Sequence, residues 1–335
     1  MISYFNSAYP VRYLTALLIA LVLWLPSFIL VGYVPIQESL LSHLEPIGFI
    51  SAHTPFFIWG SFAITYLSAI AINQILKEYD LVSINNTIGL ALFIVFASAI
   101  PLFTSVNAMT LANLFLILVI QGILRLSHVE NPVNVVFNTS LFLGIASLFF
   151  TPVFYLILVI WMALVINRHV DIRNLMISLV GLLLPYLFLF TWFFWNDSLA
   201  GHWHETIRQL AEIKLLNITA SLGIFDMIVL VLSLLILILA VLRAIGRFGE
   251  VSIYTRRNML ITLYYLAVSF LIILFYSGTM LPLMILIPPT AMLVAATAYD
   301  KKNKWWSFLF TLYFLLIILN QYSSYIIDVK TFLFR

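Results

Sequence analysis

Charged residues are absent from long blocks of the chain, and these blocks indicate its architecture. A helix needs about 20 apolar residues to cross the hydrocarbon core of a bilayer. The strands of a membrane β-barrel would alternate polar and apolar positions, whereas these blocks are apolar on every face. We therefore predict an all-α, polytopic membrane helical bundle. The uncharged blocks are 13–34, 55–76, 81–103, 105–124, 136–167, 174–196, 227–242, 258–299 and 305–327.

Two of these blocks are too long for a single crossing. At about 1.5 Å per residue, a helix over 258–299 would be about twice as long as the bilayer is thick, and Ser277-Gly278-Thr279 near its middle supplies a turn. Residues 136–167 break at Thr151-Pro152, because proline lacks a backbone donor and disfavours helical geometry in the residue before it. Counting both as helical hairpins predicts about 11 transmembrane helices. We expect them to form one polytopic domain, residues 1–335, without a soluble domain.

Composition supports a membrane protein and narrows its chemistry. Hydrophobic residues make up 64% of the chain and charged residues 9%, against roughly 25% charged in soluble domains. The basic residues are scattered between the blocks and form no patch, so no nucleic-acid partner is expected. The chain has no cysteine, which excludes a disulfide, a thiolate metal site and a thiol nucleophile. The first block is long and lacks a small-residue cleavage site, so it resembles a retained helix.

Positive charge orients the predicted spans. Cytoplasmic loops carry the excess of Lys and Arg. We therefore predict a cytoplasmic N-terminus, a periplasmic C-terminus and a multi-pass location in a bacterial inner membrane. This topology leaves Arg208, Lys214, Lys330 and Arg335 outside. It places on the inner side Arg12, Lys77, Arg125, Arg168, Arg173, Arg243, Arg247, Arg256, Arg257, Lys301, Lys302 and Lys304.

The first polar segment on the predicted outer side covers residues 37–54. In a helix, Glu38, Ser42 and Glu45 share one face and a row of leucines occupies the other, until Pro46 ends the helix. Such a helix lies along the membrane surface with its carboxylates towards water.

The second outer segment, residues 196–222, repeats this design. Over 203–216 we predict a flat amphipathic helix with an apolar stripe that includes Trp203. On its other face, the spacing of Glu205, Arg208 and Glu212 allows them to pair. Both segments can be read as solvated connectors that only position the neighbouring spans.

The outer segments also concentrate the reactive side chains. A carboxylate at an apolar boundary has its pKa raised and can act as a general acid or base. His202 and His204 would supply two metal ligands if their segment were extended, but no zinc motif is completed, and we predict no metal and no cofactor. The residues concerned are Glu38, Glu45, Glu205, Glu212, His43, His53, His202 and His204.

The spans themselves are poor in ionisable groups. Ion-coupled transporters usually place such a group near the bilayer midplane. Asp226 lies at the outer end of its span and is expected to start a helix. Buried amides such as Asn113 are expected to join spans by hydrogen bonds. Pro185 and Pro288-Pro289 are expected to interrupt helices. No phosphate-binding loop, zinc-protease or serine-hydrolase motif is present.

Two resemblances add to this interpretation. The opening MISYFNSAYPVRYLTALLIALVLW is similar to the start of an uncharacterised family of multi-spanning inner-membrane proteins of Bacteroidota, which implies no established activity. The stretch NTSLFLGIASLFFTP at 138–152, with the basic turn RHVDIR at 168–173, resembles the middle of the polytopic GT-C glycosyltransferases. Those enzymes take a sugar from a polyprenyl-phosphate carrier at the outer face, using an acidic residue of the first outer loop.

The second resemblance assigns roles to named residues. It implies that Glu38, or Glu45 as second choice, is the general base, and that Arg208 and Lys214 hold the lipid phosphate. We group His43, His202 and His204 with these as candidate substrate-binding residues. The chain departs from those enzymes in having a lone Glu instead of an acidic Asp pair, short outer loops and no soluble C-terminal domain.

Three functions therefore stay open. The first is a transferase of a sugar from a polyprenyl-phosphate-linked donor at the periplasmic face. The second is a non-catalytic membrane scaffold or accessory subunit that binds other cell-envelope proteins. The third is a transporter of a lipid or small apolar solute. In each case membrane lipids surround the protein.

Overall fold

The protein is a bundle of α-helices joined by short 3-10 helices. The computed structural model describes residues 5, 11–29, 54–83, 85–213, 223–276, 280–298 and 304–333, and contains no strand among them. The α-helices are α1 (Val11–Ile29), α3 (Thr54–Glu78), α4 (Ile88–Ala97), α5 (Ala108–Arg125), α6 (Val133–Phe149), α7 (Ile157–Ile166), α8 (Ile172–Trp195), α9 (Leu199–Ala211), α10 (Ile224–Gly246), α11 (Ile253–Tyr276), α12 (Ile287–Ala298) and α13 (Lys304–Leu333). The 3-10 helices are η2 (Pro101–Thr104), η3 (Leu126–His128), η4 (Thr151–Leu156) and η5 (Leu281–Leu286).

Length and composition identify which helices can cross a membrane. Seven of the described helical segments are long and apolar enough to do so: Val11–Ile29, Phe56–Glu78, Ala108–His128, Ile172–Trp195, Ile224–Gly246, Ile253–Tyr276 and Leu281–Ala298. Four shorter apolar segments lie beside them, at Ile88–Ala97, Val133–Phe149, Thr151–Ile166 and Ser307–Ser323. The predicted class, an all-helical multi-pass membrane protein, is compatible with this set.

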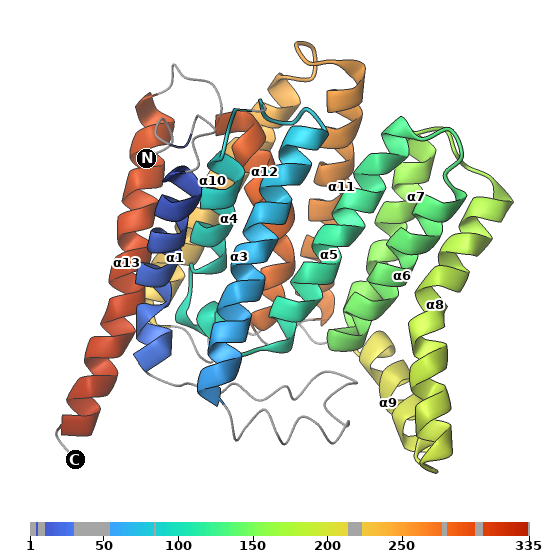
Figure 1. Ribbon diagram of the computed structural model, residues 1–335, viewed down its shortest axis with the longest axis horizontal. Helices are drawn as coiled ribbons and strands as arrows, with labels where there is room; N and C mark the ends of the chain where they lie inside the picture. Colours follow the sequence, from blue (N-terminus) through green and yellow to red (C-terminus); the bar gives the residue numbers. More distant parts are fainter. Residues whose placement is uncertain are drawn as a thin grey trace.

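The helices run roughly parallel and antiparallel between two ends of the bundle (Figure 1). α1 ends at Ile29 and α3 begins at Thr54 at one end, and α9 lies at that same end. We call it the α9 end. Ile29, Thr54 and Trp195 therefore lie at the same end of the bundle.

Basic residues gather at the other end of the bundle. Lys77, Arg125 and Arg243 lie in the last turns of helices that finish there. Arg173 and Arg256 lie in the first turns of helices that begin there. We call this end the basic end. An asymmetry of this kind is what the positive-inside rule requires of a membrane protein.

The bundle has an apolar exterior as well as an apolar core. Every residue of α4 and of α12 is buried, and both helices lie at its centre. In contrast, α10 exposes large side chains, with Val231 66% and Leu242 62% exposed. α8 exposes Phe188 and Trp195 in the same way. A soluble fold would bury these side chains, whereas lipid solvates them without a hydrophobic cost.

Small residues let α6 approach α8 closely. A Cβ atom added at Gly144 would come 2.5 Å from the Leu182 carbonyl oxygen, and one at Gly181 would come 2.7 Å from the Phe137 carbonyl oxygen. The two helix backbones thus touch at both glycines. Since water drives little association inside a bilayer, such van der Waals contact is a main source of helix affinity there.

Three of the 3-10 helices begin with proline at their first or second residue and interrupt the bundle near the α9 end: η2, η4 and η5. Interruption leaves backbone carbonyls without helical partners. A buried amide supplies one partner, since Gln321 Nε2 donates to Ser98 O at 2.8 Å. Asn113 Nδ2 adds a second donor, at 2.9 Å, to Met284 O, which also accepts from the Ile287 backbone N–H. Asn320 Nδ2 donates to Ala99 O at 3.2 Å. These bonds allow irregular backbone inside the bundle.

The structure confirms the predicted break at Thr151-Pro152, since α6 ends at Phe149. α11 ends at Tyr276, and the turn expected at Ser277-Gly278-Thr279 lies outside the described residues. It shortens one expected span, because only Ile88–Ala97 of the block 81–103 is α-helical. Pro288-Pro289 do not interrupt a helix. They lie in the first turn of α12, where a missing backbone donor costs no hydrogen bond.

The close contact of α6 and α8 predicts a steric effect at Gly181. Gly181→Ala should lower the free energy of unfolding by about 1–3 kcal/mol, because the new Cβ pushes against backbone that has little room to move. The measurement is the midpoint of unfolding in a titration with sodium dodecyl sulfate. Gly60→Ala is the control, because no atom lies within 4 Å of a Cβ added at Gly60. Equal midpoints for the two variants would contradict this account of the helix contact.

Candidate functional site

The candidate site lies at the α9 end, where α9 packs beside α8 and η4 (Figure 1). Sequence periodicity predicted a helix over 203–216, whereas the helix begins at Leu199 and ends at Ala211. Thr206 on its inner face is buried, while Trp203 and Ile207 stay about half exposed. The predicted amphipathic character is therefore confirmed over 199–211. The expected continuation beyond residue 213 lies outside the described residues.

His202 attaches the start of α9 to the end of α8. Its ring stacks on Phe193 with 3.8 Å between ring centroids. Its Nδ1 lies 2.8 Å from the Ser198 carbonyl oxygen. A carbonyl only accepts, so Nδ1 carries the proton in this arrangement. Next to it, Trp203 meets Phe190 edge to face at 5.4 Å between centroids.

Two hydrogen bonds attach the end of α9 to η4. Thr151 Oγ1 donates to Gln209 Oε1 at 2.6 Å, and Tyr155 Oη donates to the Leu210 carbonyl oxygen at 2.9 Å. Tyr155 in turn stacks on Tyr276 of α11, with 5.0 Å between centroids. The proline break at η4 thus exposes polar groups that hold the amphipathic helix across the ends of α6, α7 and α8.

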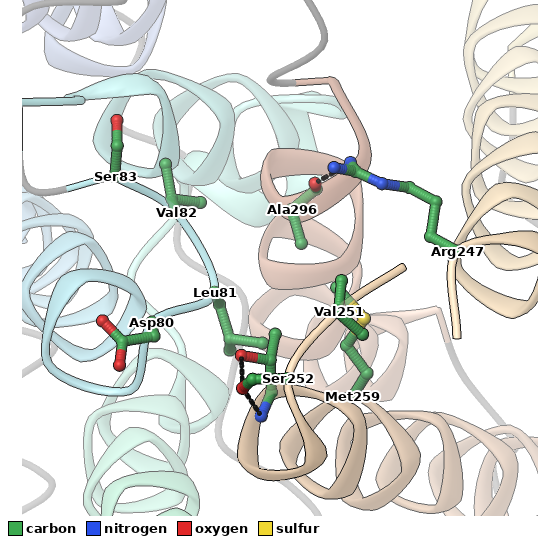
Figure 2. Close-up of a pocket in the computed structure, with 10 residues that line it drawn as sticks. Asp80, Leu81, Val82, Ser83, Arg247, Val251, Ser252, Met259 and Ala296 are labelled. Carbon is green, nitrogen blue, oxygen red and sulfur yellow. Dashed lines mark hydrogen bonds between the residues drawn. The ribbon is translucent and has the colours of Figure 1, made fainter. Parts of the chain in front are cut away.

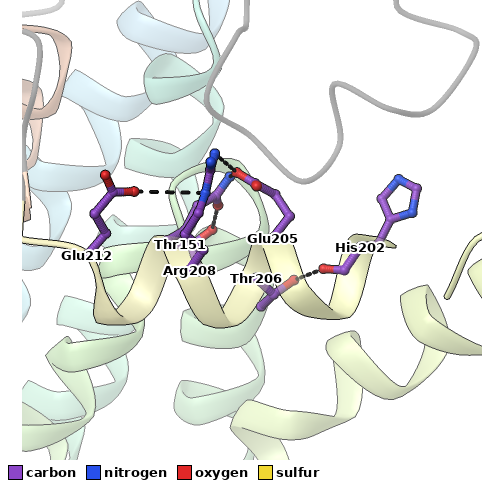
Figure 3. Close-up of polar contacts among 7 residues, drawn as sticks. Thr151, His202, Glu205, Thr206, Arg208 and Glu212 are labelled. Carbon is purple, nitrogen blue, oxygen red and sulfur yellow. Dashed lines mark hydrogen bonds and ion pairs between the residues drawn. The ribbon is translucent and has the colours of Figure 1, made fainter. Parts of the chain in front are cut away.

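Arg208 lies between two carboxylates on the outer face of α9 (Figure 3). Its Nη2 is 2.9 Å from Glu205 Oε1, and its Nε is 3.8 Å from Glu212 Oε2. The pairing predicted from the sequence spacing is confirmed. The Arg208 side chain is 63% exposed, so water weakens both interactions and their contribution to stability is small. With two acids around one base, the cluster carries a net negative charge.

An apolar groove of about 470 Å³ runs between α8 and α9. Tyr186 and Phe190 form part of its α8 wall, and Leu199 and Trp203 close it from α9. The groove faces the lipid-exposed side of α8, as the exposure of Leu187 and Phe194 shows. Its chemistry suits a hydrocarbon chain. Its full lining is Leu183, Tyr186, Leu187, Phe190, Thr191, Phe194, Leu199 and Trp203.

The predicted site residues do not all fall within the described chain. Glu38, Glu45, His43 and Lys214 lie outside the described residues. Arg208, His202 and His204 all lie on α9.

His202 and His204 could bind one metal ion together only from an extended segment, and the structure does not place them in one. The two residues are on a helix, where positions two apart point in different directions. Within the described ranges, no group of three or more His, Cys, Asp or Glu residues is arranged to hold a metal ion.

Asp226 starts a helix, as predicted. Its Oδ2 accepts a hydrogen bond from the Gly223 backbone N–H at 3.0 Å, at the first turn of α10. Its Oδ1 accepts from Asn320 Nδ2 at 2.8 Å. Both carboxylate oxygens are therefore engaged in fixing α10 and α13.

No protein-family model, curated protein or solved structure matches this chain. The residues of the α9 end are therefore interpreted from their own geometry.

Sequence reasoning missed the groove and the attachment of α9 to η4. Six of the groove residues belong to the apolar span that forms α8, and the other two, Leu199 and Trp203, lie on α9. In the sequence, Thr151 and Tyr155 could be recognised only as residues at or near a proline break. A break in a membrane helix does signal free polar groups nearby, and this signal leads to the partners of Gln209 and Leu210.

The hydrogen bonds between η4 and α9 predict a local effect of Tyr155→Phe. Removing the hydroxyl frees the Leu210 carbonyl, so backbone amides over 199–211 should exchange with deuterium several-fold faster, as local opening becomes cheaper. Exchange measured by mass spectrometry on the protein in detergent tests this. Thr191→Val is the control, since the Thr191 hydroxyl bonds only to its own helix, at Leu187 O. Unchanged exchange in α9 would contradict the proposed attachment.

Proposed function

We propose that this chain is a multi-pass inner-membrane protein with its basic end in the cytoplasm and its α9 end in the periplasm. The positive-inside asymmetry of the helix ends supports the orientation. Seven long apolar segments, with four shorter apolar helices beside them, support a multi-pass protein. In this orientation, α9, the end of α1 and the start of α3 share the periplasmic side.

We propose further that the protein transfers a sugar from a polyprenyl-phosphate-linked donor at the periplasmic face. The observation that carries this proposal is the apolar groove between α8 and α9, which lies beside an amphipathic helix and suits a hydrocarbon chain. The polyprenyl chain would occupy the groove from the bilayer. Its phosphate would then lie at the level of α9, where apolar and polar surfaces meet.

In this transfer, one residue accepts the proton and different residues stabilise the leaving phosphate. Glu38 takes the proton from an acceptor hydroxyl, whose oxygen forms a bond to the anomeric carbon of the sugar. The bond from that carbon to the phosphate oxygen breaks, and the polyprenyl phosphate leaves with the electron pair. Fixed cations near the departing phosphate stabilise its charge, which is often the largest contribution to such a step.

Arg208 must first exchange one of its present carboxylate partners before it can bind that phosphate. Its two carboxylate partners already offset its charge, and a phosphate would approach both of them. The contact with Glu212 at 3.8 Å is longer than a charge-assisted hydrogen bond of about 2.7–2.9 Å. We therefore propose that a phosphate displaces Glu212 and leaves the Glu205 contact intact. Lys214, close by in sequence, adds a second cation in this proposal.

The groove predicts where a lipid-linked donor binds. Trp203→Ala should lower cross-linking of a photoreactive polyprenyl phosphate by about fivefold, the change that about 1 kcal/mol of lost contact produces. Trp195→Ala is the matched control. Trp195 is the last residue of α8, lies at the α9 end of the bundle, is 84% exposed and does not line the groove. Equal losses in both variants would remove the groove from the proposal.

The proposed general base predicts a separate kinetic effect. Glu38→Gln keeps size and hydrogen bonding but cannot accept the proton, so the rate of sugar transfer should fall at least about 100-fold while donor cross-linking stays unchanged. The assay measures radiolabelled sugar transferred by membranes that contain each variant. A transfer rate that Glu38→Gln leaves unchanged would disprove the catalytic role of Glu38.

One observation favours a second candidate, a non-catalytic scaffold of a cell-envelope assembly. The outer face of α9 exposes Arg208 and Glu212 within a cluster in which the arginine is already paired with two carboxylates. Such a face suits docking of another protein as well as it suits a substrate. A groove that binds no polyprenyl phosphate, in a protein that is otherwise folded, would favour the scaffold.

A further inference from the structure

The buried face of α11 is polar along most of its length. Positions three or four apart share one face of an α-helix, and the buried polar residues of α11 recur at this spacing over about a quarter of its circumference. The opposite face exposes Leu271 and Phe275. α11 is thus apolar towards lipid and polar towards the interior of the bundle. The buried polar residues, which we call the polar face, are Thr255, Asn258, Thr262, Tyr265 and Ser269.

Three atoms of the polar face lack a hydrogen-bond partner in the protein. Polar side chains inside a membrane usually bond to a neighbouring helix or to their own backbone. Asn258 Nδ2 donates to Tyr79 O at 3.4 Å, and Thr262 Oγ1 donates to Asn258 O at 2.9 Å. In contrast, Tyr265 Oη, Ser269 Oγ and Asn258 Oδ1 have no partner among the described residues. Tyr265 is only 2% exposed and Ser269 is fully buried.

These unpaired atoms need a partner from outside the protein. A buried polar group without a partner lowers stability, and lipid offers it none. A serine hydroxyl can turn to a carbonyl of its own helix, but the Tyr265 hydroxyl lies at the end of a long, rigid side chain and cannot. Residues 258–276 contain no Asp, Glu, Lys, Arg or His. A neutral partner therefore suits this face better than an ion, and buried water is the usual one.

At the basic end of the bundle, the polar face reaches a pocket of about 430 Å³ (Figure 2). The pocket lies where the turn after α3, the turn between α10 and α11, and the end of α12 meet. Thr255, the first residue of the polar face, lines it beside Ser252, with 2.9 Å between their hydroxyl oxygens. Because Ser83 and Ser252 are exposed, water can reach the start of the polar face from this end. The polar residues of the lining are Asp80, Ser83, Arg247, Ser252 and Thr255.

Towards the α9 end, apolar and aromatic side chains follow the polar face. The next buried residues of α11 after Ser269 are Ile272 and Ile273. Beyond them, Tyr276 stacks on Tyr155 with 5.0 Å between ring centroids. The polar face extends about 21 Å at about 1.5 Å per residue, whereas the hydrocarbon core of a bilayer is about 30 Å thick. It therefore enters the bundle from the basic end without reaching the α9 end.

We infer that the polar face of α11 binds a row of water molecules that enters from the pocket at the basic end and ends near Ser269. The hydroxyl groups of Tyr265 and Ser269 can each donate and accept within this row, and Asn258 Oδ1 accepts. α11 thus lines a half-channel that brings water into the centre of the bundle from one side. The half-channel does not depend on the transfer reaction proposed for the α9 end.

Radiolytic labelling in isotopically labelled water tests for this row. X-rays generate hydroxyl radicals from water in place, so a buried side chain gains labelled oxygen only where water lies beside it. In the full-length protein in detergent, Tyr265 should be labelled about tenfold faster than Tyr186, because only Tyr265 has bound water as its partner. Tyr186 is the matched control, since it is 5% exposed and its hydroxyl donates to Ser147 Oγ at 2.9 Å. Equal rates at the two tyrosines would overturn the proposal.

A variant at the pocket tests where the water enters. Thr255→Leu places an apolar side chain at the start of the polar face and should lower the labelling rate of Tyr265 several-fold. Thr191→Leu is the control, because it makes the same substitution in the groove at the α9 end. An undiminished rate in Thr255→Leu, or an equal fall in both variants, would exclude entry from the basic end and with it the half-channel.

Removing the Tyr265 hydroxyl distinguishes a hydrated group from an unpaired one. Tyr265→Phe deletes the bond to water and should raise the equilibrium constant for unfolding in sodium dodecyl sulfate about fivefold, equivalent to about 1 kcal/mol. Tyr264→Phe is the control, because Tyr264 is 40% exposed and lies outside the polar face. Loss of a dry, unpaired hydroxyl would have the opposite sign. A Tyr265→Phe variant at least as stable as the unmodified chain would therefore refute the bound water.

Discussion

The fold depends on satisfying every backbone polar group where no water is available to do so. Regular membrane helices meet this condition internally, but the break before η2 does not. Gln321 and Asn320 meet it there, because their side-chain amides donate to the carbonyl oxygens of Ser98 and Ala99. The bundle can therefore hold short, fully buried helices such as α4 and α12 at its centre. Without those amides, the carbonyl groups of Ser98 and Ala99 would lose these donors in an apolar interior.

The groove and the pocket of this protein lie at the two ends of the bundle and not at its packed centre. At the α9 end, the proline break before η4 supplies Thr151 and Tyr155, which hold an amphipathic helix over an apolar groove. At the basic end, the termini of three helices surround a pocket with Asp80 on one side and Arg247 on the other. The groove and the pocket thus arise from the same packing, although their linings differ in chemistry.

The sequence predicted features whose cause is local and missed features whose cause is tertiary. The break at Thr151-Pro152 follows from proline chemistry alone, and the pairing of Arg208 follows from helical spacing. The limits of α9 did not follow from periodicity, because contacts of His202 with Phe193 and of Leu210 with Tyr155 set them. The groove was missed for the same reason, since no local pattern distinguishes an α8 face that meets lipid from one that meets α9.

The two arginines show how local surroundings decide what a cation can do. Arg208 is exposed between two carboxylates, so its charge is offset before any ligand arrives. Arg247 donates to a backbone carbonyl, which orients its guanidinium, and among the described residues it forms no ion pair. This difference follows from which acceptor each guanidinium meets in the fold, since the residue type is the same.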